Sequence, residues 1–117
     1  MKALLGLRNL VTNVNLPNRG QLLGIPLGAV VETNAVFMRD RIVPMVAGKL
    51  PDDINALVLR NVYNQETTLK AGLLKDKELA FKAFANDPLV DLNIGEAKQL
   101  FNEMLRNTRE YLEGWDC

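Results

Sequence analysis

The stretch VAGKLPDDINAL, residues 46–57, divides the sequence into two parts with different hydrophobic periods. Pro51 followed by Asp52 and Asp53 is typical of a helix start, because proline presets φ in the first turn and the carboxylates face the positive end of the helix dipole. Before this stretch, β-branched residues and turn signals dominate; after it, apolar residues recur at helical spacing. The sequence therefore predicts strands followed by helices, an α+β fold.

The part before residue 50 predicts a small antiparallel sheet over residues 10–48. Its first strand alternates apolar and polar residues, as a strand covered on one side does. A polar link from Met38 to Arg41 predicts a hairpin between the second and third strands, and the prolines and glycines of PNRGQLLGIPLG predict a loop between the first and second. The expected strands are Leu10–Leu16, Ala29–Met38 and Arg41–Val46.

The part after residue 50 predicts a helical layer over residues 51–113. The expected helices run over residues 51–74, 76–85 and 94–113, with Asn93 as the cap of the third. We expect residues 1–117 to form a single domain. A three-stranded sheet under one helical layer leaves sheet edges uncovered, which indicates part of a larger protein.

Composition excludes several classes of function. Lys and Arg total 14, as do Asp and Glu, so no net field steers a nucleic acid, while the absent net charge favours self-association. No apolar run approaches the roughly 20 residues that span a bilayer. The sole cysteine, Cys117, is the last residue, so no disulfide can form within the chain and we expect a cytoplasmic protein.

Missing residue types also limit what chemistry this chain can perform. It has no histidine, which is the commonest general base and metal ligand, and no glycine-rich phosphate loop. The paired carboxylates Asp52–Asp53 and Asp87–Asp91 fall at expected helix starts or turns, where acidic residues are ordinary. We therefore assign no catalytic, cofactor-binding or metal-binding residue to this chain.

The segment NVNLPNRG, residues 13–20, offers possible contacts to a substrate or to another subunit at Asn15, Asn18 and Arg19. Carboxamides can donate to and accept from sugar hydroxyls, and the planar arginine fork suits a carboxylate or phosphate. The alternative is a turn in which the asparagines only satisfy backbone groups before Pro17 and Gly20. The residues themselves favour the turn.

Several motifs together resemble the C-terminal part of glycoside hydrolase family 4. They are NVNLPNRG at 13–20, AVVETNA at 29–35, QETT at 65–68, KELA at 77–80 and DPLV at 87–90. The resemblance covers nearly the whole chain in order. It implies the C-terminal half of a fold related to the lactate and malate dehydrogenases, and corresponds to about the last quarter of such an enzyme.

The resemblance also implies a reaction that this chain cannot complete alone. Enzymes of the family cleave sugar glycosides by NAD-dependent oxidation at carbon 3, elimination, water addition and re-reduction, with manganese as a metal. NAD and manganese are thus implied for the parent enzyme, whose N-terminal NAD-binding half is the expected partner. This chain would supply scaffold, part of the substrate cleft and contacts in a homo-oligomer, and would be inactive by itself.

Two other interpretations stay open. The chain could be a stand-alone interaction module that pairs an exposed sheet edge with another chain. It could also be the C-terminal half of a related dehydrogenase, although the proline-asparagine motif and the DPLV turn resemble the glycosidases more closely.

Overall fold

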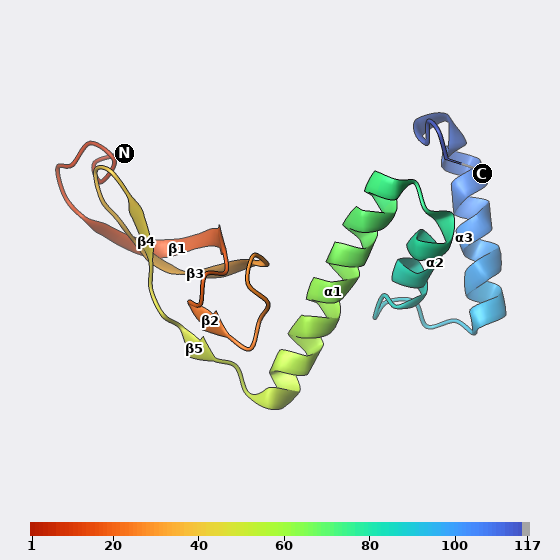
Figure 1. Ribbon diagram of the computed structural model, residues 1–117, viewed down its shortest axis with the longest axis horizontal. Coiled ribbons are helices and arrows are strands. Elements are labelled where there is room, and N and C mark those ends of the chain that lie inside the picture. Colours follow the sequence, from red (N-terminus) through yellow and green to blue (C-terminus); the bar gives the residue numbers. More distant parts are fainter. Residues whose placement is uncertain (116–117) are drawn as a thin grey trace. The chain divides into compact units, whose positions relative to one another are not determined.

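The computed structural model describes residues 1–115 (Figure 1). These residues divide into two compact units, with the boundary between Leu59 and Arg60. The first unit contains the strands and the first turns of helix α1, and the second contains the other helical turns. The predicted fold class, a small antiparallel sheet followed by three helices, is confirmed. The single domain expected over residues 1–117 stays a prediction.

The main sheet has three antiparallel strands in the order β1-β3-β4. β1 (Leu10–Pro17) pairs along its whole length with β3 (Val30–Phe37), and β3 continues through a hairpin into β4 (Ile42–Pro44). The hairpin closes where Met38 N–H donates to the carbonyl oxygen of Arg41 at 2.9 Å, as the polar link predicted. The central strand alternates buried and exposed residues, so one face of the sheet is covered and the other is open.

A second, two-stranded sheet was not predicted. β2 (Leu22–Leu23) and β5 (Gly48–Lys49) pair in parallel, and Ala47 N–H donates to the carbonyl oxygen of Gln21 at 2.7 Å beside them. Two-residue strands are too short to show a period, so the sequence indicated only loop at both places. This pairing ties the loop after β1 to the segment that leads into α1.

The three helices begin close to their expected positions. α1 is Asp52–Leu74, α2 is Lys77–Ala85 with Asp76 as its cap, and α3 is Ile94–Thr108. Asn93 and Glu96 form a capping box that satisfies backbone donors at the start of α3. α3 is shorter than predicted, because the chain tightens into the 3₁₀ turn η1 (Arg109–Tyr111), whose apolar spacing resembles that of an α-helix.

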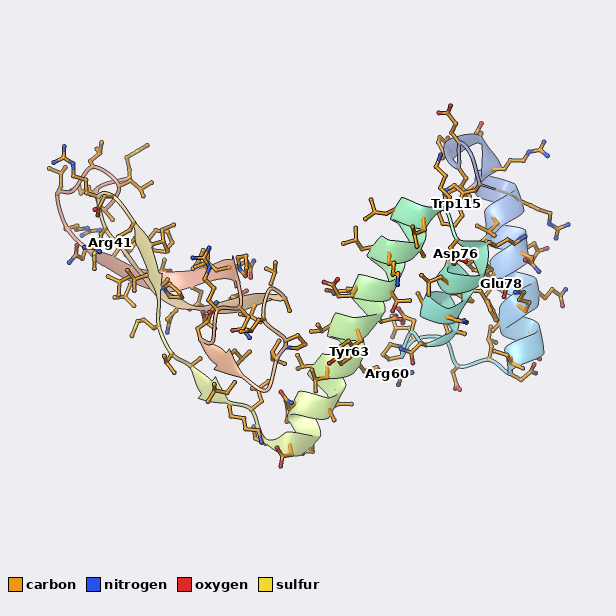
Figure 2. The ribbon with its side chains drawn as sticks, viewed as in Figure 1. Arg41, Arg60, Tyr63, Asp76, Glu78 and Trp115 are labelled. Atoms are coloured by element: carbon orange, nitrogen blue, oxygen red, sulfur yellow. The ribbon has the colours of Figure 1, made fainter. Side chains whose placement is uncertain are left out.

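The core of the helical unit is formed where α2 packs on α3. The Phe101 ring lies 5.5 Å from the rings of both Phe81 and Phe84, in tilted arrangements. Lys98 Nζ donates a hydrogen bond to Glu78 Oε1 at 2.8 Å and lies 4.3 Å from the centre of the Phe81 ring. Figure 2 labels Glu78 on α2. None of the helices among residues 1–115 is long and apolar enough to cross a membrane.

Candidate functional site

The loop after β1 is organised around the side chain of Asn18, which is only 2% exposed. Its Nδ2 donates to the carbonyl oxygens of Leu22 at 2.9 Å and Ile25 at 2.8 Å. Its Oδ1 accepts the N–H groups of Gly20 at 3.1 Å and Leu22 at 3.2 Å. These are the bonds that the turn interpretation requires, and they occupy the carboxamide that a sugar hydroxyl would need.

Gln21 holds the same loop from its other end, and sequence reasoning missed it. The residue is 3% exposed; its Nε2 donates to the carbonyl oxygen of Pro17 at 3.0 Å, and its Oε1 accepts the N–H of Arg19 at 2.7 Å. A glutamine between a glycine and two leucines carries no periodic or turn signal, so nothing in the sequence singled it out. Gln21 and Asn18 together fix the backbone from which the Arg19 side chain projects.

Arg19 lies at a small hollow of about 130 Å³ at the end of the sheet. The other residues of this hollow are Leu16, Pro17, Ile42 and Pro44. The Arg19 side chain is exposed and, within residues 1–115, its guanidinium forms no ion pair. A guanidinium that lines such a hollow can bind a carboxylate or phosphate through two parallel hydrogen bonds. We call this place the Arg19 hollow.

Asn15 does not face the Arg19 hollow. Because side chains alternate along a strand, Asn15 lies on the opposite face of the sheet from Leu16, which lines the hollow. It is exposed and lies directly across from Glu32, whose Oε1 also accepts Asn13 Nδ2 at 3.3 Å. The three predicted contact residues are therefore separated: Asn18 is buried in the loop, Arg19 lines the hollow, and Asn15 belongs to an open polar sheet face.

Two of the acidic residues considered in the sequence, Asp52 and Asp87, have local partners. Asp52 forms an exposed ion pair with Lys49 at 2.6 Å, and Asp87 Oδ1 accepts the N–H of Leu89 at 2.8 Å within its turn. Within residues 1–115, no group of three or more His, Cys, Asp or Glu side chains is arranged to hold a metal ion. Cys117 lies outside the described residues.

Residues 1–90 match the family model described as the family 4 glycosyl hydrolase C-terminal domain. An alpha-galacturonidase of Thermoanaerobacterium saccharolyticum is 64% identical over 115 residues, which are 98% of this chain and 25% of that protein. The chain therefore spans about a quarter of the length of this curated relative.

Solved structures agree with this assignment. The Bacillus subtilis structure described as the glucosidase lplD is 54% identical with a TM-score of 0.83, over 89% of this chain and 24% of that one. The 6-phospho-beta glucosidase of Thermotoga maritima, solved with manganese, NAD⁺ and glucose-6-phosphate, is 27% identical with a TM-score of 0.78, over 88% of this chain and 25% of that one. This chain belongs to glycosyl hydrolase family 4, in which it corresponds to the C-terminal domain.

Proposed function

We propose that this chain is the C-terminal quarter of a family 4 α-galacturonidase, an enzyme that hydrolyses the O-glycosyl bond of a galacturonide. The observation that carries this proposal is the 64% identity to an alpha-galacturonidase across 98% of the chain. The other named relatives above 40% identity, from three further bacteria, are also alpha-galacturonidases. Their agreement favours a substrate that carries a carboxylate.

The reaction that we propose for the whole enzyme uses NAD and manganese to oxidise and re-reduce the sugar during elimination. The Thermotoga maritima relative was solved with both groups, which supports this assignment. The residues of this chain fit neither group: for NAD it has no glycine-rich phosphate loop, and for manganese it has no histidine and its described carboxylates form no ligand cluster. We infer that the rest of the enzyme supplies the redox and metal chemistry and that this chain alone is inactive.

The contribution that we propose for this chain is structural, with one contact to substrate. The Arg19 hollow would receive the carboxylate of the uronate, because its guanidinium has no ion-pair partner among residues 1–115 and its backbone is held by Gln21. Asn18 would hold the loop in place. Asn15, on the open polar face, would serve a contact between subunits of a homo-oligomer.

A domain exchange tests the proposed function. The last quarter of the Thermoanaerobacterium saccharolyticum enzyme is replaced by residues 1–117 of this chain, giving a full-length protein that we call the chimera. We expect the chimera to release nitrophenol from nitrophenyl α-galacturonide much faster than from the α-glucoside or α-galactoside. Dialysis against chelator should remove this activity, and NAD with manganese should restore it.

Different results of this experiment would contradict different parts of the proposed function. A folded chimera that prefers a neutral sugar would contradict the substrate, and activity unaffected by dialysis and add-back would contradict the cofactors. A folded chimera that is inactive on all three sugars would favour the interaction module, in which the exposed edge strand β1 pairs with another chain.

A further inference from the structure

An apolar groove in the helical unit is not explained by the function proposed above. It has a volume of about 510 Å³ and is lined by residues of α1, α2 and α3, of the turn at 87–90, and by Trp115. Figure 2 labels Trp115. Its floor is apolar, with Ala71, Ala83 and Phe101 all less than 10% exposed. We call this surface the helical groove.

Three polar atoms on the residues that line the helical groove have hydrogen-bond partners inside the unit. Thr68 Oγ1 donates to the carbonyl oxygen of Asn64 at 2.9 Å, and Asp87 Oδ1 accepts the N–H of Leu89 at 2.8 Å. The Asn64 carboxamide oxygen accepts Asn86 Nδ2 at 3.5 Å. A sugar or nucleotide needs several free donors or acceptors to be held in place, so the groove fits apolar side chains better.

The DPLV turn places a leucine at the rim of this groove. Asp87 N–H donates to the carbonyl oxygen of Phe84 at 3.1 Å, Val90 N–H donates to that of Asp87 at 3.0 Å, and the Asp87 carboxylate holds Leu89 N–H. Pro88 fixes its own φ, so the turn has little freedom. Leu89 is nevertheless 92% exposed, the highest value for a large apolar side chain among residues 1–115. An ordered turn that exposes a leucine beside an apolar groove is typical of an interaction surface.

We propose that the helical groove and Leu89 are the surface on which the preceding three quarters of the enzyme docks, through apolar side chains. This inference rests on the proposed function, which makes those residues part of the same polypeptide. The fold of this chain recurs inside a solved chain of which it covers only 24%. A covalently attached partner is present at high effective concentration, which a free ligand or a second copy is not. The balance of 14 basic and 14 acidic residues provides no long-range attraction for a charged partner.

Thiol labelling of Leu89→Cys tests the docking surface without relying on catalysis. The variant is made in the 117-residue chain and in the chimera, and the labelling rate of each cysteine is read by peptide mass spectrometry, which separates it from Cys117. The control is Tyr111→Cys, because Tyr111 is 79% exposed in η1 and does not line the groove. We expect the cysteine at position 89 to be labelled at least about tenfold more slowly in the chimera than in the isolated chain. The labelling rate of the cysteine at position 111 should differ by less than about twofold between the two proteins.

Two labelling outcomes would overturn the docking proposal. Equal labelling of residue 89 in both proteins would show that the groove stays open, whether or not the chimera hydrolyses galacturonide. Protection in the isolated chain that grows with protein concentration would assign the groove to a second copy. If the Leu89→Cys chimera does not fold, hydroxyl-radical footprinting of Leu89 and Trp115 in the unsubstituted proteins gives the same comparison. An inactive chimera with a protected Leu89 would contradict the proposed function and leave the docking surface standing.

Discussion

At the scale of single residues, the loop after β1 has buried side chains that hold its backbone and one exposed side chain that is free to contact a ligand. Asn18 and Gln21 are almost fully buried, and their carboxamides form hydrogen bonds with backbone groups, whereas the neighbouring Arg19 side chain is exposed. The sequence predicted a turn from asparagine, proline and glycine, and the hydrogen bonds of Asn18 are those of a turn. It could not predict Gln21, because a buried glutamine is recognised only by the carbonyl groups that the fold brings to it.

The role of Asn18 is tested by Asn18→Asp in the 117-residue chain. The change replaces a donor with a carboxylate that faces the carbonyl oxygens of Leu22 and Ile25. We expect the free energy of unfolding to fall by about 2–4 kcal/mol at pH 7, because those carbonyls lose their donor and a charge is buried. Urea unfolding followed by circular dichroism measures the loss. The exposed Asn15→Asp is the control, and an equal effect at both positions would contradict the supporting role.

Arg19 is tested by Arg19→Met in the chimera, with Arg19→Lys as the conservative variant. We expect kcat/KM for the galacturonide to fall by about tenfold to a hundredfold, since a charged hydrogen-bond pair is lost, while activity on the galactoside is unchanged. Arg19→Lys should retain part of the activity, because it keeps the charge without the planar fork. The control is Arg41→Met, an exposed arginine of the hairpin (Figure 2). A similar loss on both sugars would contradict a contact with the carboxylate.

At the scale of elements, local signals set the ends of helices and long-range pairing sets the small sheet. The caps Asp76 and Asn93 lie one residue before α2 and α3, and both helix starts were predicted to within one residue. The prediction extended α3 too far, because the helical spacing of apolar residues continues through η1. The backbone there has already tightened into a 3₁₀ turn, so α3 ends earlier. β2 and β5 could not be predicted, since two residues pair across more than twenty others.

Contact between α2 and α3 makes the stability of the helical unit depend on pH. The hydrogen bond from Lys98, aided by its charge, lowers the pKa of the Glu78 carboxyl below its ordinary 4.5. Because the folded pKa is the lower one, the stabilisation is fully present above the unfolded pKa and is lost as pH falls through the folded pKa. The resulting change in the free energy of unfolding with pH is small, because Glu78 is exposed to solvent.

A double-mutant cycle of Glu78→Gln and Lys98→Met isolates that ion pair. We expect a favourable coupling energy at pH 7 that declines toward zero as the solution is acidified below the pKa of Glu78, and that weakens in 1 M salt. Urea unfolding at each pH gives the four free energies. A coupling energy independent of pH would show that packing of the Lys98 stem on Phe81 carries the interaction instead.

At the scale of the whole molecule, many large apolar side chains of the described residues are exposed. Besides Leu89, large apolar side chains of α1 such as Tyr63 and Leu73 are 58% and 76% exposed. From a thin sheet under one helical layer the sequence predicted uncovered sheet edges, but it did not predict these exposed side chains of α1. The curated relative is about four times as long as this chain. What the sequence could not predict is which surface is left open, because the helical groove exists only once three helices and a turn have met.

The most direct test of the account compares the isolated 117-residue chain with the chimera on nitrophenyl α-galacturonide, with NAD, manganese and reductant present. We expect no turnover by the chain alone, and a kcat/KM for the chimera within about tenfold of that of the parent Thermoanaerobacterium saccharolyticum enzyme, because the domains are close relatives. Turnover by the isolated chain, or a folded chimera with no turnover, would contradict the claim that this is the C-terminal quarter of an α-galacturonidase.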